Sequence, residues 1–105
     1  MYYSETQELL LKDEYIEWVK KGIKNNTIRL GERPIQLGKL KLSPASREGD
    51  SIFVHVTCVE SKTVNDLSFE NAKSDGFKSV PDLILALIKF YPDMKADDKV
   101  TVIYW

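Results

Sequence analysis

The chain has 105 residues, 43% of them hydrophobic and 10% aromatic, which is enough for one domain with a hydrophobic core. Its net charge of -1 argues against a protein that coats nucleic acid nonspecifically, and no apolar run approaches the ~18 residues that span a membrane. One Cys and one His exclude an internal disulfide and a zinc site of Cys and His ligands. We expect a single domain over residues 1–105, cytoplasmic, without a secretion signal, a metal or another cofactor.

The charges are unevenly distributed along the sequence. Between residues 12 and 47, Lys and Arg outnumber Asp and Glu by nine to four, whereas acids prevail after residue 47. A basic segment in a nearly neutral protein is compatible with a confined site for a phosphate-bearing ligand. Chance clustering in a chain with 30% charged residues gives the same pattern.

The first elements are an arm, a strand and a helix. Residues 1–6 show no periodicity and predict a loose arm or a short edge strand, and residues 7–11 carry three leucines typical of a buried strand. Residues 12–21 predict a helix because Tyr15, Ile16 and Val19 recur at helical spacing, with acids at the start and lysines at the end. Gly22 is typical of a helix end. Trp18, beside the apolar stripe, is more simply explained by packing than by base stacking.

The segment Gly22–Gly31 follows this helix directly and is the most informative stretch. In an extended strand, Thr27 and Arg29 point to one face and the apolar residues between them to the other, with Lys24 arriving from the preceding turn. A lysine, a hydroxyl and a guanidinium brought together suit an anion, a carbonyl oxygen or a nucleobase edge. A solvated strand edge is the alternative.

The middle of the chain predicts strands joined by turns. Residues 39–42 alternate as a short strand that carries Lys39 and Lys41 on one face, and residues 43–49 read as an exposed loop. Residues 51–59 predict one long strand, and because both faces are largely apolar we expect it to be central. On that strand we expect His55 to be a partly buried histidine and Cys58 a small core residue.

The last third predicts helices and a closing strand. Residues 61–64 suggest another strand, and residues 67–74 a short helix that stops at Asp75-Gly76. Ser79, with Pro81 and Asp82 in the first turn, predicts the start of a longer helix that ends before Pro92. Residues 99–105 form the final strand. These elements predict an α+β fold, a small mixed and mostly antiparallel barrel with about two to three flanking helices.

Several features in this order resemble one family. They are the helix followed by Gly22-Ile23-Lys24-Asn25-Asn26-Thr27-Ile28-Arg29, the Gly49-Asp50 turn, Asp75-Gly76-Phe77, the helix ending in Tyr91-Pro92 and the closing strand. The sequence resembles the ASCH domain of the PUA-like superfamily over nearly its whole length. The resemblance implies a β-barrel with a cleft beside the helix-to-strand turn and a role in binding RNA or nucleosides.

One branch of small bacterial ASCH proteins, the acetylcytidine amidohydrolases, carries a Gly-x-Lys-x-x-Thr-x-Arg motif. Gly22, Lys24, Thr27 and Arg29 match it. By that resemblance Lys24 is the activating base and Thr27 the nucleophile of an amide hydrolysis. The branch also uses a glutamate before the second long helix, where this chain offers Asp75 or, a turn earlier, Glu70.

Three hypotheses follow for this segment. A binding module would hold RNA phosphate or a modified nucleoside with the cationic residues Arg29, Lys39 and Lys41 and stack a base near Trp18 or Phe77. An amidohydrolase would use Arg29 to orient the substrate and would need a largely neutral Lys24, whereas binding needs a charged one. In the third, Lys24 pairs with Asp75 only to hold a loop.

Overall fold

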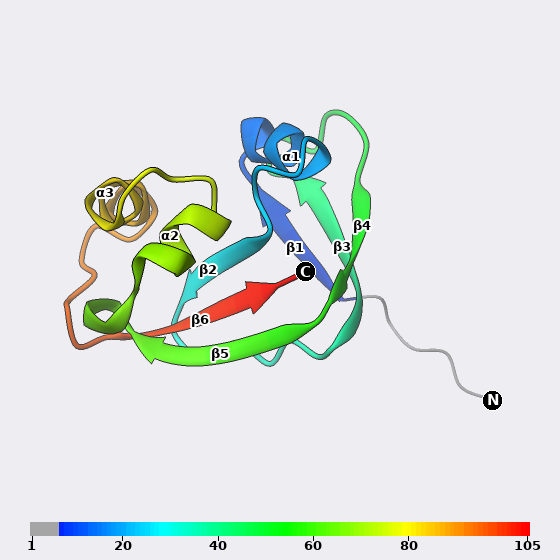
Figure 1. Ribbon diagram of the computed structural model, residues 1–105. Helices are drawn as coiled ribbons and strands as arrows, with labels where there is room; N and C mark the ends of the chain where they lie inside the picture. The colour runs from blue at the N-terminus through cyan, green and yellow to red at the C-terminus, as the bar shows by residue number, and fades with distance from the viewer. Residues whose placement is uncertain (1–6) are drawn as a thin grey trace.

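The computed structural model describes residues 7–105, so the expectation for residues 1–6 lies outside the described residues. Within this range the chain forms six strands, three α-helices and one 3-10 helix (Figure 1). Their order is β1 (Glu8–Leu11), α1 (Asp13–Lys20), β2 (Asn26–Leu30), β3 (Gly38–Pro44), β4 (Ile52–Val56), β5 (Cys58–Thr63), η1 (Val64–Asp66), α2 (Phe69–Ser74), α3 (Val80–Phe90) and β6 (Lys99–Tyr104).

The strands pair into two three-stranded sheets, in the orders β1-β3-β4 and β2-β6-β5. β1 runs parallel to β3, and the other pairs are antiparallel. The predicted α+β class, the mixed and mostly antiparallel pairing and the number of helices are thus confirmed. The strand pairing among residues 7–105 gives two sheets and not a closed barrel. The sheets approach each other where β4 passes into β5, and there the Thr57 amide donates to the Tyr104 carbonyl at 2.9 Å.

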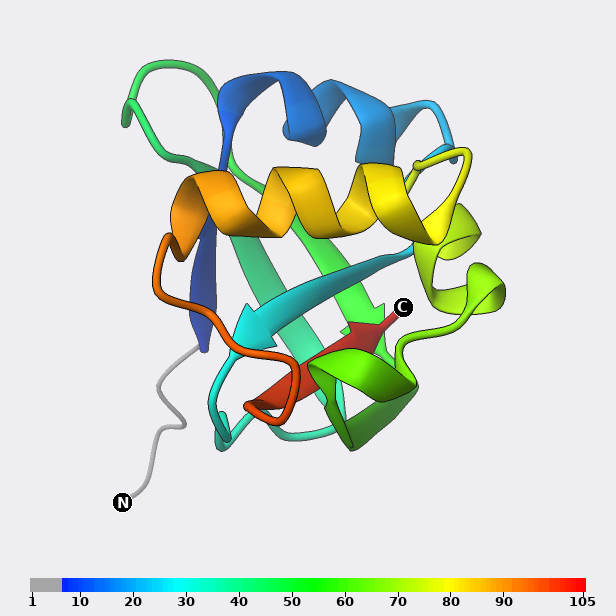
Figure 2. The same cartoon turned by 90° about the vertical axis from the view of Figure 1, so that its left-hand side faces the viewer.

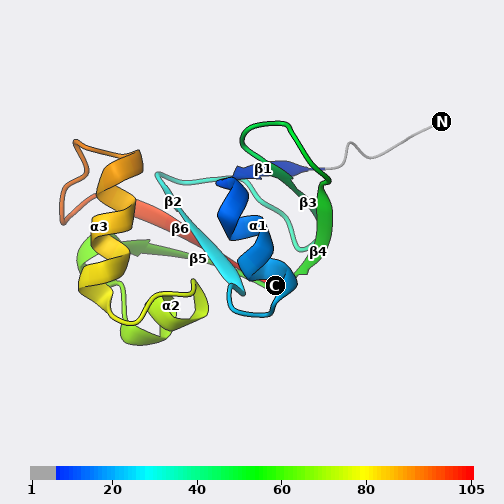
Figure 3. The same cartoon turned by 90° about the horizontal axis from the view of Figure 1, so that it is seen from above.

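The helices cover the sheets in two groups, each with its own part of the core. α2 and α3 pack on the β2-β6-β5 sheet, where Ile28, Leu83 and Val102 are buried together. α1 packs near β3, and Ile16 is buried there with Leu40 and Leu42. Figure 2 shows α3 between α1 above and β2 below, and from above β2 passes between the two helices (Figure 3). None of the helices described is long and apolar enough to cross a membrane.

Capping serines and glycines mark the ends of the helices. The Ser79 hydroxyl accepts a hydrogen bond from the Asp82 amide at 3.2 Å, as its position before the helix predicts. Ser68 caps α2 through the Asn71 amide in the same way. Gly22 and Gly76 follow the ends of α1 and α2 with positive φ angles of 75° and 91°, a conformation that glycine adopts without steric cost.

The predictions for residues 43–64 need correction. Residues 51–59 are not one central strand but parts of β4 and β5, which are edge strands of different sheets. His55 and Cys58 are exposed, contrary to the expected burial. Apolar alternation indicates a strand but not how many neighbours it has, and the chain bends at Thr57 to change sheets. The predicted loop after residue 42 begins later, because β3 continues to Pro44 alongside β1.

Candidate functional site

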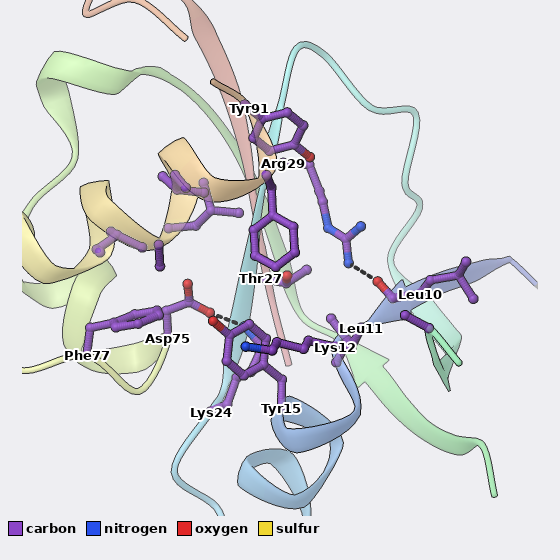
Figure 4. A pocket seen from close by; sticks show the side chains of 16 residues that line it. Leu10, Leu11, Lys12, Tyr15, Lys24, Thr27, Arg29, Asp75, Phe77 and Tyr91 are labelled. Carbon is purple, nitrogen blue, oxygen red and sulfur yellow. Dashed lines mark hydrogen bonds and ion pairs between the residues drawn. The ribbon is translucent and has the colours of Figure 1, made fainter. Parts of the chain in front are cut away.

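A cavity of about 300 Å³ lies among β2, α1, α3 and the end of α2 (Figure 4). Most of its walls are apolar, and a few polar side chains converge in it, which is the usual composition of a small-molecule site. It is lined by Leu10, Leu11, Lys12, Tyr15, Lys24, Thr27, Ile28, Arg29, Ala45, Asp75, Phe77, Leu83, Ala86, Leu87, Phe90 and Tyr91. We call it the inner pocket.

The turn after α1 brings Lys24 into the inner pocket. The Lys24 amide donates to the Trp18 carbonyl at 3.1 Å, which closes the end of the helix. The next amide, of Asn25, donates to the Ser74 carbonyl at 2.6 Å. Because Ser74 precedes Asp75, this bond places the residues after α1 and after α2 side by side.

Lys24 and Asp75 form a buried ion pair in which the Lys24 ammonium donates to the Asp75 carboxylate. Only 2% of Lys24 and 4% of Asp75 are exposed. The Lys24 Nζ also lies 5.2 Å from the centre of the Tyr15 ring, within the range of a cation–π contact. Lys24 is therefore held on two sides and cannot extend into solvent.

Burial shifts the titration of this pair toward the uncharged forms. Desolvation lowers the pKa of Lys24, and the nearby Arg29 charge adds to this while Asp75 opposes it. Desolvation likewise raises the pKa of Asp75 to about 6, although Lys24 and Arg29 oppose the rise. Both directions follow from burial, so Lys24 is easier to deprotonate than an exposed lysine.

Thr27 and Arg29 reach the same pocket from β2, where they alternate with the buried Ile28. Thr27 is 4% exposed and lines the pocket. The Arg29 guanidinium donates through Nη2 to the Leu10 carbonyl at 2.6 Å (Figure 4). Desolvation lowers the pKa of Arg29, which remains a cation.

Three aromatic residues pack beside the ion pair. The rings of Tyr15 and Trp18 lie 4.7 Å apart between centres, and Phe77 meets both edge to face. Tyr15 and Phe77 line the inner pocket, whereas Trp18 lines a broader groove of about 690 Å³ that shares those two walls. Trp18 also covers Gly76, where an added Cβ would come within 2.8 Å of its ring.

The remaining candidates lie elsewhere. Lys39 and Lys41 line neither cavity: the Lys39 ammonium lies 4.4 Å from the centre of the exposed Phe53 ring, and the Lys41 Nζ lies 3.9 Å from a Glu8 carboxylate oxygen. Glu70 is exposed in the first turn of α2, so Asp75 is the acid that meets Lys24. No group of three or more His, Cys, Asp or Glu among the described residues could hold a metal ion.

Sequence reasoning missed part of the pocket wall. The spacing of Tyr15 predicts only a place on the apolar stripe of a helix and does not indicate a contact with Lys24. The α3 residues Ala86 and Phe90 and the following Tyr91 also line the pocket. The apolar stripe of α3 predicts which of its residues pack against the sheet, but it does not predict which residues border a cavity.

No protein-family model and no curated protein matches the sequence. Among solved structures, the chain is similar to an ASCH domain from Lactobacillus crispatus JV V101, with a TM-score of 0.74 and 19% identity over 93% of this chain and 77% of that one. It is also similar to a protein of Enterococcus faecalis V583 of the DUF984 family, with a TM-score of 0.68 and 12% identity over 99% and 80% of the two chains. The chain therefore has the fold of an ASCH domain, as its sequence resemblance predicts.

Proposed function

Starting from the ASCH-domain fold and the contents of the inner pocket, we propose that this protein is a small amidohydrolase that removes the acetyl group from acetylcytidine. The observation that carries the proposal is the meeting of Lys24, Thr27, Asp75 and Arg29 in one mostly apolar cavity. Lys24 and Thr27 line the same cavity, and a hydroxyl needs a nearby base such as a lysine amine to become an effective nucleophile. The size of the pocket suits a single modified base rather than several nucleotides.

Lys24 is better suited to a base than to a contact with phosphate. Its ammonium is buried and already engaged by Asp75, so a phosphate group would have to break that pair. Burial, in contrast, lowers the pKa of Lys24, so the transfer of its proton to Asp75 is easier than proton loss from an exposed lysine. Asp75 holds the amine in place through its hydrogen bond and is a positioning residue.

Before the first step the Lys24 ammonium passes a proton to the Asp75 carboxylate, which leaves a neutral amine. The Thr27 hydroxyl oxygen then forms a bond to the acetyl carbonyl carbon, and its proton passes to that amine. The carbonyl oxygen becomes an oxyanion, which the Arg29 guanidinium stabilises. The bond between that carbon and the exocyclic nitrogen of cytosine then breaks, and the nitrogen takes the proton from Lys24. Cytidine leaves, and the acetyl group remains as an ester on Thr27.

In the second step water attacks the ester carbon and gives a proton to Lys24. The bond from the carbon to the Thr27 oxygen breaks, and Lys24 returns the proton to that oxygen. The acetyl group leaves with the added hydroxyl as acetic acid, which ionises to acetate. The pocket residues are thereby restored to their starting state.

A module that binds RNA or a nucleoside without hydrolysis is the second candidate. It is favoured by the broad groove beside the inner pocket, where Trp18 and Phe77 offer aromatic surfaces. Three lysines line this groove against two acids, Glu14 and Asp82. In that case the inner pocket would hold one splayed base, and the groove would hold the flanking backbone.

The test is incubation of the pure protein with acetylcytidine, followed by chromatography for cytidine. We expect turnover in the wild type and its loss in Thr27→Val, which removes the hydroxyl at nearly constant volume, and in Lys24→Met. Thr57→Val is the matched control, because Thr57 is exposed and lines neither cavity.

Two results would count against the hydrolase. Folded wild type without turnover would reject it and leave the binding module, to be tested by titration with single-stranded RNA at several salt concentrations. Turnover that persists in Thr27→Val would exclude Thr27 as the nucleophile.

A further inference from the structure

The cationic side chains of the inner pocket differ in their partners. Three such side chains line it: Lys12, Lys24 and Arg29. Lys12 pairs with Glu14 at 2.7 Å, and Lys24 pairs with Asp75. Arg29 has no carboxylate partner within residues 7–105, and a single backbone carbonyl, that of Leu10, accepts from it. Among the described residues Arg29 is thus the pocket cation that forms no direct salt bridge, although Asp75 and Tyr91 lie near enough to influence its charge.

We infer that Arg29 forms a binding site for a small monocarboxylate such as acetate. A guanidinium presents five donors in a planar fork, and here Nη2 is the nitrogen that bonds to Leu10. A carboxylate matches that fork with two parallel hydrogen bonds, which are stronger than neutral ones. The anion would also neutralise a charge that is partly withdrawn from water.

The walls of the pocket favour a carboxylate over a phosphate. Ala86, Leu87 and Phe90 line the pocket and offer apolar contacts for a methyl group. A phosphate has more oxygen atoms than a single guanidinium can satisfy, and the Lys24 ammonium is already bonded to Asp75. The additional negative charge of a phosphate would lie in the pocket without a free cation, because Lys12 is paired with Glu14, and this is costly.

This site would have a consequence for the enzyme. That the bound carboxylate is a reaction product rests on the proposed function, because deacetylation releases acetate at the position where Arg29 faces the carbonyl oxygen. Acetate would then occupy the place of the acetyl group and inhibit competitively. The binding itself does not require turnover.

The experiment measures binding to the wild-type chain without substrate. Sodium acetate is titrated by calorimetry at constant ionic strength, in parallel with sodium chloride, inorganic phosphate and acetamide, the neutral analogue of acetate. We expect saturable acetate binding that Arg29→Gln weakens by roughly tenfold or more. Arg29→Lys, which keeps the charge but loses the fork, should bind acetate with intermediate affinity.

Arg33→Gln is the matched control, because Arg33 is an exposed guanidinium that also donates to a backbone carbonyl, that of Leu30 at 3.0 Å, but lines neither cavity. It should bind acetate like the wild type. Thermal unfolding without ligand shows that each variant is folded.

The inference is overturned if acetate binds no better than chloride or acetamide, if phosphate binds more tightly than acetate, or if Arg29→Gln binds acetate like the wild type. The experiments distinguish a failure of this inference from a failure of the proposed function. Acetate binding without acetylcytidine turnover supports the carboxylate site and rejects the hydrolase, whereas turnover without acetate binding does the reverse.

Discussion

Lys24 and Asp75 are 51 positions apart in the sequence, yet they form a buried ion pair at the base of the inner pocket. The bond between the Asn25 amide and the Ser74 carbonyl ties the two backbones together beside them. Two charged groups withdrawn from water stabilise a protein little, because desolvation offsets their attraction. Their placement is better explained by the chemistry of the pocket than by stability.

Replacing one partner of this ion pair should therefore destabilise the protein more than replacing both partners with apolar residues. Asp75→Ala leaves the Lys24 charge buried without a partner, and we expect a loss of about 3–5 kcal/mol in the free energy of unfolding, measured with urea. The double variant Lys24→Met with Asp75→Leu should recover a large part of that loss. Lys12→Gln, which breaks an exposed ion pair with Glu14, should leave stability unchanged. A double variant no more stable than Asp75→Ala would contradict this account.

The Asp75 carboxyl should titrate well above an ordinary aspartate. Burial raises its pKa to about 6, so the folded state binds this proton more tightly than the unfolded state. The stability that this proton contributes is complete below about pH 4 and is lost as the pH rises through about 6, in total roughly 2–3 kcal/mol.

Carbon NMR of the carboxyl groups measures this titration directly. The Asp13 carboxyl is the internal control, because hydrogen bonds from Ser46 lower its pKa. Removing the opposing charge with Lys24→Met should raise the Asp75 midpoint further. A midpoint below 4 in the wild type would show that Asp75 is not desolvated as described.

Gly76 should be intolerant of a side chain for two reasons. Its φ angle of 91° is unfavourable for alanine, and a Cβ would lie 2.8 Å from the Trp18 ring. Gly49 has nearly the same φ angle, 92°, but no atom within 4 Å of an added Cβ. We expect Gly49→Ala to cost about 1–2 kcal/mol in unfolding free energy and Gly76→Ala a further 1–3 kcal/mol. Equal losses of unfolding free energy in the two variants would mean that the Trp18 side chain moves aside without an energetic cost.

Filling the inner pocket should abolish its function without unfolding the protein. Ala86 lines the pocket from α3 and is only half-buried, so Ala86→Phe has room to fold while it occupies the cavity. We expect acetylcytidine turnover to fall by about tenfold or more. Leu85→Phe is the control, since Leu85 is exposed and lines the broad groove but not the inner pocket. If the two variants lost turnover equally, the inner pocket would not be where the substrate reacts.

Some features of this protein follow from neighbouring residues and were accessible in the sequence. The helices over residues 13–20 and 80–90 follow the local rule of apolar spacing, and Ser79 caps the second one, so their positions could be predicted. Thr27 and Arg29 share a face because strand side chains alternate. Lys39 and Lys41 also share a strand, and the same reasoning could not reveal that they lie outside both cavities.

The sequence by itself determined the α+β class, most of the elements and the cluster of a lysine, a hydroxyl and a guanidinium in ten residues, because these depend on contacts within a few positions. Only the tertiary structure decided that Asp75 meets Lys24, that Tyr15 covers it, and that residues 51–59 divide between two sheet edges. Those outcomes depend on contacts between distant segments, whose geometry is fixed by the packing of the whole chain. Burial, and with it the shifted pKa of Asp75, is likewise a property of the folded molecule.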